Sequence, residues 1–331
     1  MNLDYECRIV TPMFMGGAEP LRAELRSPSF KGALRFWWRA LNGFLPITEL
    51  KKREGQLFGG TDKNQGRSKV QINILANDLL TSKAPLPQHV IKTISKGKTI
   101  PVNILDYLSF GTYKWNKEQR RNEFLKEYIE PGSFKLRLRI VGASDEQVKE
   151  IREALYLLSN FGGLGACSRN GYGSIQVNDP YFLTSPLTFL DSLDLPERTP
   201  EYTAFSGGLK YFKTKNIYDT WDQALANLGV VYRECRSSLE PKHQYDKRKY
   251  LANPLIADRV SRSVLNRRAK PYFMHVAPCG TGYEGRILYL PAAFTTDVSI
   301  SKAERGLMDT RFAAVCGEMN ELLAKHLEVV I

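Results

Sequence analysis

Residues 27–43 (SPSFKGALRFWWRALNG) constrain the fold more than any other stretch of this chain. Ser27 and Pro28 suit a helix N-terminus, and Gly43 suits a C-cap. Between them, apolar side chains recur at the spacing of one helix face: Phe30, Ala33, Leu34, Trp37, Trp38 and Leu41. The pattern predicts an amphipathic helix over residues 28–42, with both tryptophans in the core.

The opposite face of this helix carries positive charge. At about 100° per residue, Lys31, Arg35 and Arg39 align along one edge. Gly32 lies beside them and offers bare backbone. We call these three cations the cationic ridge, and we expect it to face solvent as a rigid anion-binding surface.

The net charge of +12 is concentrated in two windows. Residues 22–53 carry a net charge of +6 and residues 241–270 carry +7, so the rest of the chain is close to neutral. Two basic patches on a neutral body favour a polyanionic partner, above all nucleic acid, because Lys and Arg contacts to phosphate supply most of its non-specific affinity. A merely solubilising surface is the alternative, and it is harder to exclude for the second window.

Other compositional features exclude several classes of protein. The five cysteines are odd in number, widely spaced and without a CxxC pair, which indicates a reducing compartment and neither a disulfide framework nor structural zinc. No apolar run approaches the roughly 18 residues of a membrane span, and the first residues lack the pattern of a signal peptide. We therefore expect a cytoplasmic protein without a membrane partner.

Alternation and capping signals predict a first domain over residues 1–178. The strand FKLRLRIV is the clearest, because its apolar and basic residues alternate. The expected elements are strands at residues 4–11, 70–74, 101–108, 134–141 and 174–177, and helices at residues 28–42, 118–129 and from Ser144 or Asp145 to about Asn160. This order fits the ferredoxin-like βαββαβ pattern with an extra element.

A proline-rich stretch near residues 179–200 leads into a predicted second domain, residues 179–331. The expected elements are helices at residues 217–239, 255–267 and 305–326, and strands at residues 271–276 and 286–292. A second, divergent ferredoxin-like unit fits this order. The fold class is therefore predicted to be α+β, with two such domains packed side by side.

Glycines crowd residues 162–173 (GGLGACSRNGYG), which we call the glycine loop. It follows a helix and precedes a strand, and Ser168 stands where a dinucleotide-binding fingerprint needs glycine, so that motif is excluded. The composition predicts a loop whose backbone approaches another backbone closely. Arg169 and Asn170 at its tip, with Tyr172 to stack a base, would suit RNA contact. A plain structural turn is the alternative.

Catalytic signals are weak. The sequence has no HExxH, GxSxG or paired Cys/His signature. His89 and His243 lie in polar loops, and His275 lies in an apolar strand that favours a core role. We predict no catalytic residue, metal ligand or cofactor. Trp115, between Lys114 and Lys117, is predicted either to stack a base or to anchor a core beneath a loop.

Four segments resemble the RAMP superfamily of CRISPR proteins, namely RIVTPMFMGGAEP, RSPSFKGALRFWWRAL, LFGGTDKNQGRSKVQI and GGLGACSRNGYGS. Residues 266–276 (NRRAKPYFMHV) resemble a second-domain motif of the type III-B (Cmr) branch, in which paired arginines precede a short strand. The resemblance implies two ferredoxin-like domains in a non-catalytic, RNA-binding structural subunit. It also implies guide RNA, single-stranded target RNA and other Cmr subunits as partners. At Cys167 the family often has another arginine.

Charge, loop composition and resemblance together assign the RNA-facing positions. These are Arg26, Lys31, Arg35 and Arg39 on the helix, Gly163, Gly165, Arg169, Asn170 and Tyr172 on the loop, and Lys247, Arg248, Lys249, Arg267 and Arg268 in the basic segment. Two alternatives stay open. One is a metal-independent RAMP endoribonuclease that processes guide RNA, with His243 as its base, and the other is a purely architectural subunit.

Overall fold

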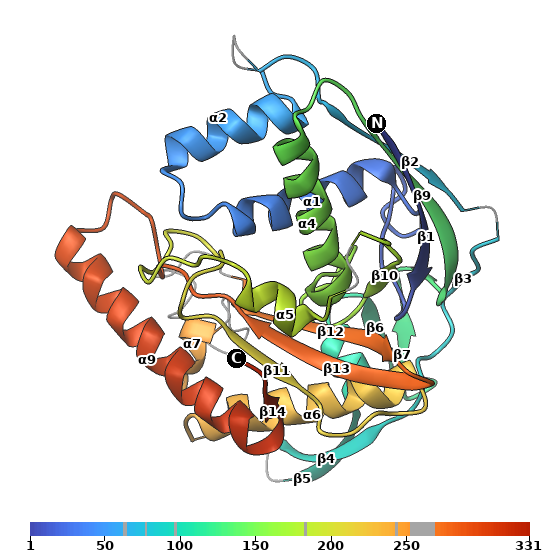
Figure 1. Ribbon diagram of the computed structural model, residues 1–331. Coiled ribbons are helices and arrows are strands. Elements are labelled where there is room, and N and C mark those ends of the chain that lie inside the picture. Colours follow the sequence, from blue (N-terminus) through green and yellow to red (C-terminus); the bar gives the residue numbers. More distant parts are fainter. Residues whose placement is uncertain (62–64, 77, 96–97, 182–183, 242–243, 252–268) are drawn as a thin grey trace.

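The structure is a computed structural model that describes residues 1–331 with the exception of residues 62–64, 77, 96–97, 182–183, 242–243 and 252–268. Its largest elements are two four-stranded antiparallel sheets and the helices between them (Figure 1). Each sheet is built from one half of the chain.

The first sheet comes from the N-terminal half. Its elements follow the chain order β1 (Asn2–Ile9), α1 (Ser27–Leu41), β2 (Val70–Leu75), β9 (Gly132–Ile140), α4 (Asp145–Phe161) and β10 (Ile175–Val177). The strands lie in the spatial order β10-β1-β9-β2, and every neighbouring pair is antiparallel. Helices α1 and α4 lie on the same side of this sheet (Figure 1).

The second sheet has the same connectivity. Its elements follow the chain order β11 (Lys210–Lys213), α6 (Trp221–Ser238), β12 (Tyr272–Cys279), β13 (Gly282–Tyr289), α9 (Lys302–His326) and β14 (Glu328–Val329). The strands lie in the order β12-β13-β11-β14, again with antiparallel neighbours. In both sheets the first strand of the unit lies between the third and the fourth, and the second strand lies at the edge beyond the third.

Shorter elements complete the described part of the chain. They are α2 (Ile47–Phe58), β3 (Thr81–Ser82), β4 (Val90–Ser95), β5 (Lys98–Asn103), α3 (Ile104–Leu108), β6 (Tyr113–Asn116), β7 (Arg121–Phe124), β8 (Tyr128–Ile129), α5 (Pro186–Asp191) and α7 (Arg248–Leu251). Strands β4 and β5 form one hairpin, β6 and β7 form another, and β3 pairs with β8. No helix in the described part of the chain is long and apolar enough to span a membrane.

The second sheet is buried on both faces. Phe273 and Leu288 face the core that α1 and α4 share with the first sheet, whereas Met274 and Ile287 belong to the core beneath α6 and α9. This explains why β12 and the end of β13, from Ile287 to Tyr289, are largely apolar, the usual sign of a strand covered on both sides.

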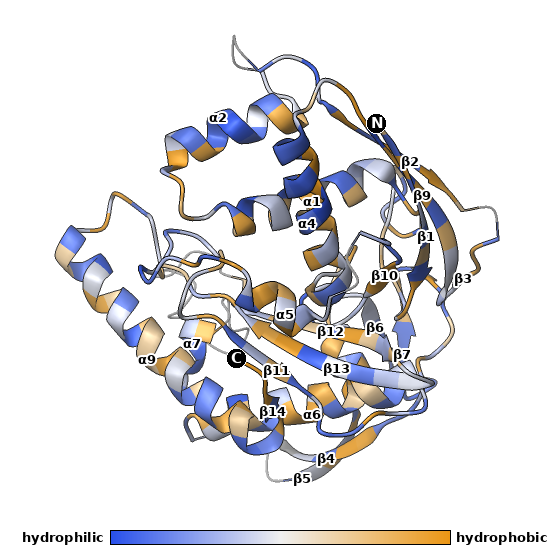
Figure 2. Ribbon diagram, viewed as in Figure 1, coloured by the Kyte–Doolittle hydropathy of each residue, from blue (hydrophilic) through white to orange (hydrophobic). Residues whose placement is uncertain are grey.

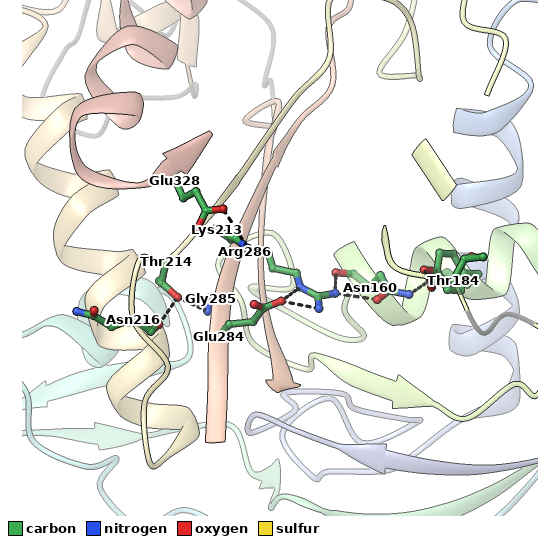
Figure 3. A network of polar contacts seen from close by, with 10 residues as sticks. Asn160, Thr184, Lys213, Thr214, Asn216, Glu284, Gly285, Arg286 and Glu328 are labelled. Carbon is green, nitrogen blue, oxygen red and sulfur yellow. Dashed lines mark hydrogen bonds and ion pairs between the residues drawn. The ribbon is translucent and has the colours of Figure 1, made fainter. Parts of the chain in front are cut away.

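Polar contacts cross the boundary between the two halves. The guanidinium of Arg286 donates to Oε1 of Glu284 over 2.7 Å and to Oδ1 of Asn160, on α4, over 2.7 Å (Figure 3). Nδ1 of His275 lies 2.7 Å from the carbonyl oxygen of Gly162. These bonds and the shared apolar core fix the second sheet against the C-terminal end of α4.

Several predicted elements are confirmed. Strand β9 buries Phe134, Leu136, Leu138 and Ile140, as its alternation requires. Helix α4 begins with a capping box in which Ser144 accepts a hydrogen bond from the backbone of Gln147. In helix α1 the predicted stripe is inside, but Arg26 rather than Ser27 is the N-cap, and Asn42 rather than Gly43 is the C-cap.

Two predictions of local structure are wrong, and one helix was not predicted. Residues 101–108 are not one strand, because the Asn103 side chain accepts a hydrogen bond from the backbone of Leu105 and starts helix α3. Residues 118–129 are not a helix, because they contain strand β7, which pairs with β6 so that Tyr113 lies opposite Phe124, and then strand β8. Helix α2 was not expected at all. The predicted helix at 255–267 lies outside the described residues.

Candidate nucleic-acid interface

Two of the three cations of the cationic ridge pair with helix α2, which runs past α1 with mostly hydrophilic residues between apolar ends (Figure 2). The guanidinium groups of Arg35 and Arg39 both reach Oε1 of Glu54, at 2.7 and 2.8 Å. Glu54 is buried, and the two arginine side chains are 37% and 39% exposed. The expectation of a ridge that faces open solvent is therefore wrong, because two arginines share one carboxylate and keep a net charge of +1.

The cations near the N-terminus of α1 also have partners within the protein. Nζ of Lys31 donates to Oγ of Ser68 over 2.5 Å. Burial and the nearby Arg35 lower the pKa of Lys31. Arg26 lies 3.8 Å from Glu24 in a loose ion pair.

The glycine loop makes the close backbone approaches that its composition predicts. Gly165 has a φ of +84°, and a Cβ atom there would lie 2.6 Å from the carbonyl oxygen of Phe14. A Cβ atom at Gly163 would lie 2.8 Å from the carbonyl oxygen of Tyr172. The loop thus packs against the segment that follows β1, and its first residues pack against its last residues.

The tip of the glycine loop is not a stacking platform. Tyr172 is fully buried, and its hydroxyl donates to the carbonyl oxygen of Leu105 over 2.7 Å. Asn170 donates to the carbonyl oxygen of Leu108 over 2.7 Å and pairs with Met274 in a parallel bridge. The expectation that Tyr172 stacks a base is wrong, because the loop tip is inserted between α3 and β12.

Arg169 lies where the two halves of the chain meet. Its guanidinium lies over the ring of Phe273, 4.4 Å from the centroid, and over Phe36 of α1 at 5.7 Å. Nη1 donates to the carbonyl oxygen of Lys270. Stacking and hydrogen bonding therefore hold this charge in one place, next to the glycine loop and the start of β12.

A groove of about 270 Å³ runs between α1 and the glycine loop, and we call it the glycine-loop groove. Its lining combines aromatic rings with small polar groups: Ser29, Ala33, Phe36, Trp37, Gly162, Gly163, Leu164, Gly165, Ser168, Arg169 and Phe273. The first turns of α1 contribute to one wall, where the helix dipole favours negative charge. The structure thus brings α1 and the glycine loop together, but through a face of α1 that excludes the cationic ridge.

The described part of the basic segment is balanced by acids. Lys247 lies 2.6 Å from Glu318 and Arg248 lies 2.9 Å from Glu240. Lys249 lies 3.5 Å from Asp246. These ion pairs reduce the positive charge that these three predicted RNA contacts offer. Arg267, Arg268 and His243 lie outside the described residues.

Among these acids, Glu240 accepts hydrogen bonds from backbone N–H groups as well as from a cation. Burial would raise its pKa, but backbone N–H groups of Lys247 and Arg248 donate to it, and the net effect lowers the pKa. Its charge is thereby kept on the protein and offsets Arg248.

Chemical groups for catalysis are not gathered at the groove. His89 lies 2.6 Å from Asp222 on α6, His275 is buried, and His326 ends α9. Among the described residues, no three His, Cys, Asp or Glu side chains cluster as metal ligands would. Trp115 is 57% exposed, so its interpretation as a core anchor is wrong.

Sequence reasoning missed four residues that now matter. Ser29 and Ser168 supply hydroxyl groups to the groove, and Phe36 and Phe273 supply its rings. The spacing of Phe36 was available, because it adjoins the buried stripe of α1. The role of Phe273 could not be predicted from spacing, because it depends on how the second sheet packs against the first half of the chain.

Comparisons with known proteins identify the family. Residues 6–176 match the RAMP superfamily. The chain is 30% identical over 186 residues to the CRISPR system Cmr subunit Cmr1-2 of Pyrococcus furiosus, which covers 52% of this chain and 93% of that protein. It is 27% identical over 294 residues to Cmr1-1 of the same organism, which covers 80% of each.

Solved structures share the fold. The crystal structure of apo Cmr1 from Pyrococcus furiosus superposes with a TM-score of 0.57 at 21% identity, over 99% of this chain and 98% of that one. A chain of the type III-B Cmr-beta complex bound to cognate target RNA superposes with a TM-score of 0.50 at 11% identity, over 94% and 98%. With the sequence matches, this places the chain in the RAMP superfamily of CRISPR proteins, as a homologue of Cmr1.

Proposed function

We propose that this protein is a non-catalytic, RNA-binding subunit of a type III-B (Cmr) CRISPR effector complex in the cytoplasm. The Cmr names of its relatives support the assignment to that complex. We propose that it consists of two ferredoxin-like domains, residues 1–178 and 179–331. The matching strand order of the two sheets supports this division.

The observation that carries the RNA-binding proposal is the glycine-loop groove. Single-stranded RNA needs donors for its phosphates and flat apolar surfaces for its bases and riboses. The groove supplies the Arg169 guanidinium and two serine hydroxyls at its walls, with Phe36 and Phe273 beside them. Gly163 and Gly165 also line the groove, and they stay predicted RNA contacts through their backbone atoms.

The predicted cations on α1 contribute a weaker second contact. Arg35 and Arg39 each keep more than a third of the side chain exposed. Together with Glu54 they retain one net positive charge, which can attract a phosphate as it leaves the groove. Arg26 and Lys31 stay predicted RNA contacts, as do Arg267 and Arg268, which lie outside the described residues.

The proposed partners are guide RNA, single-stranded target RNA and the other Cmr subunits. A Cmr-beta complex that contains a structurally similar chain is described as bound to cognate target RNA, which supports an RNA-facing position here. Crosslinking of guide and target RNA to this chain within the assembled complex tests which RNA it contacts. Crosslinks at the glycine loop and β12 are expected.

Direct binding to the full chain provides the decisive test. Arg169→Gln should weaken binding of single-stranded RNA by about tenfold, since it removes a held cation from the groove. Arg22→Gln is the matched control, because Arg22 is 71% exposed and only loosely paired with Glu19. Equal affinity in both variants would reject the groove as the RNA site.

The same RNA also tests the alternatives. Incubation with repeat RNA in EDTA should leave the RNA intact. Discrete cleavage that is lost in His243→Ala would instead identify a metal-independent endoribonuclease. Assembly with partner subunits without any RNA crosslink would identify a purely architectural subunit.

A further inference from the structure

Trp115, on strand β6, is exposed and has no ring partner in the described part of the chain. Its exposed fraction is 57%, whereas Trp37 and Trp38 are buried and Trp221 is half-buried. No described residue stacks on the Trp115 ring or places a cation over it. Single exposed rings are common on protein surfaces, so the neighbours of Trp115 decide what it signifies.

Trp115 belongs to a row of aromatic side chains that begins beside the glycine loop. Side chains alternate along a strand, so Tyr113 and Trp115 lie on the same face of β6. The ring of Phe110, which is 65% exposed, meets the ring of Tyr113 edge to face, at 6.4 Å between centroids. The carbonyl oxygen of Phe110 lies 3.9 Å from Sγ of Cys167, the residue just before Ser168 of the groove wall. We call Phe110, Tyr113 and Trp115 the aromatic row, and it starts one residue away from the glycine-loop groove.

The hairpin that carries the aromatic row is basic. Residues 110–126 contain five Lys or Arg and two Glu, a net charge of +3. Lys114 lies 3.7 Å from Glu123, and this ion pair is largely exposed. The side chains of Lys117 and Arg120, in the turn between β6 and β7, form no ion pair or hydrogen bond with a described residue. Two cations without an acidic partner therefore lie at the end of the hairpin where Trp115 is exposed.

The fold does not depend on the Trp115 ring. Tyr113 packs on Phe124 at 5.9 Å between ring centroids, and Asn122 donates to Oδ2 of Asp106 over 2.8 Å. These contacts hold the base of the hairpin on α3, and Trp115 lies beyond them toward the turn. Substitution of Trp115 should therefore leave the Tm unchanged, so that a loss of binding reports a lost contact.

We propose that the aromatic row and the turn at residues 117–120 form a second surface for single-stranded RNA, continuous with the glycine-loop groove. Every base has a π-face that can stack on an exposed indole, and the phosphates between bases pair with Lys and Arg. A partner protein with an apolar surface would instead remove Lys117 and Arg120 from water without neutralising them, which is costly. Trp115 stacks on a base, and the two cations contact phosphates. This inference rests on the proposed RNA-binding function and adds a surface to it.

RNA length and ring chemistry test the stacking contact. Trp115→Ala should weaken binding of a single strand of about 12 nucleotides by about tenfold, because base–aromatic stacking is lost. Binding of a strand of about 4 nucleotides, which fills only the groove, should not change. Trp115→Phe should retain the affinity, since Phe also stacks. Phe44→Leu is the matched control, because Phe44 is a 45% exposed ring in the turn between α1 and α2. Equal affinity of wild type and Trp115→Ala for the long strand would refute the inference.

Tryptophan fluorescence gives a readout that does not depend on affinity. Stacking of a base quenches indole emission, and Trp115 is the exposed member of the four tryptophans. Saturation with the long strand should quench the wild type. The quenching should be lost in Trp115→Phe, although this variant still binds. Quenching of equal size in both proteins would place the RNA away from Trp115.

Salt dependence tests the two cations. Lys117→Gln with Arg120→Gln should weaken binding of the long strand and reduce the slope of log affinity against log salt concentration by about 1.4, the value for two phosphate contacts of a single strand. Lys302→Gln with Arg311→Gln removes the same charge from exposed positions of α9 and is the control. An equal change of slope in both double variants would mean that net charge, and not the hairpin, is responsible.

Parallel titrations of Arg169→Gln separate this inference from the proposed groove. If Arg169→Gln weakens RNA binding and Trp115→Ala does not, the groove binds RNA and the inference is wrong. If only Trp115→Ala weakens binding, the hairpin is confirmed as an RNA surface and the groove is rejected. A Trp115→Ala variant that keeps full RNA affinity but no longer assembles with Cmr subunits would identify a protein-docking surface and overturn the inference. A wild type that binds no RNA would reject the proposed function and the inference with it.

Discussion

Nη1 of Arg39 lies 2.8 Å from Oε1 of Glu54, the same oxygen that accepts a hydrogen bond from Nε of Arg35. This contact joins α1 to α2 and converts a run of cations into an ion-paired surface. The electrostatic potential along α1 is consequently lower than its sequence predicts. A carboxylate between two guanidinium groups also fixes their positions, so the remaining charge points in a defined direction.

Glu54→Gln should release this charge. The amide cannot neutralise either arginine, so binding of single-stranded RNA should tighten about threefold at low salt. The slope of log affinity against log salt concentration should become steeper, by less than the slope of one phosphate contact. The free energy of unfolding should fall by about 1–2 kcal/mol, since charge-assisted hydrogen bonds are lost. Titrations at several salt concentrations and urea unfolding measure the two effects.

Glu49→Gln is the control for this prediction. It removes the same charge from the same helix, but Glu49 is 45% exposed and its contact with Lys52 is 3.7 Å long. Both RNA binding and stability should change little there. An equal gain in RNA affinity for both variants would mean that net charge alone, and not release of the ridge, is responsible.

How far the sequence predicts the fold depends on whether a signal is local. The alternation of β9 and the capping box of α4 are local, and both predictions are confirmed. Helix α2 has a weaker pattern, with apolar residues at its ends and charges between. The basic window of residues 22–53 ends one residue before Glu54 and so excludes the acid that pairs with Arg35 and Arg39.

The candidate site could be predicted only in part, because only some of its features depend on local sequence. The composition of the glycine loop alone predicts a close approach of two backbone segments, and this approach occurs at Gly165. Which side chains line the groove depends on how β12 packs against α1, a contact between residues more than 200 positions apart. No spacing within the chain encodes the meeting of Phe36 with Phe273, at 5.6 Å between ring centroids.

Gly165→Ala should disturb the groove. The positive φ is strained for alanine, and the new Cβ would lie within 2.6 Å of the Phe14 carbonyl oxygen. Loss of about 1–3 kcal/mol of unfolding free energy is expected, together with weaker RNA binding. Chemical denaturation and RNA titration of the same preparation measure both quantities.

Gly32→Ala is the matched substitution on α1. A Cβ atom at Gly32 meets nothing within 4 Å, and the backbone there is helical. Alanine should therefore stabilise the protein by about 0.5–1 kcal/mol and leave RNA binding unchanged. If Gly165→Ala behaves as Gly32→Ala does, the close approach at the loop is not required.

His275 should make the protein acid-sensitive. Burial, with a smaller contribution from Arg286, lowers the pKa of His275 from its ordinary value of 6.5 to about 3. Between these values the unfolded chain binds a proton that the folded chain does not, so stability is fully present above pH 6.5 and falls as the pH drops toward 3. The expected loss is about 1 kcal/mol per pH unit, measured by urea unfolding at a series of pH values.

His275→Asn should flatten this dependence. Its amide can donate to the carbonyl oxygen of Gly162, as the ring nitrogen does, but it does not titrate. His326→Asn is the control, because His326 is exposed at the end of α9 and should leave the pH profile unchanged. A wild-type profile that is preserved in His275→Asn would assign the acid sensitivity to other groups.

The buried pair of Glu284 and Arg286 offers a test of how the halves are joined (Figure 3). Glu284→Leu removes the carboxylate partner of the buried guanidinium and leaves its hydrogen bond to Asn160, so the free energy of unfolding should fall by about 3–5 kcal/mol. The double variant Glu284→Leu with Arg286→Leu removes both charges and should recover much of this loss, since apolar side chains suit a buried sheet face. Equilibrium unfolding of the wild type, both single variants and the double variant gives the coupling energy. A double variant that is no more stable than the less stable single variant would mean that the bond from Arg286 to Asn160, and not charge compensation, holds the second sheet on α4.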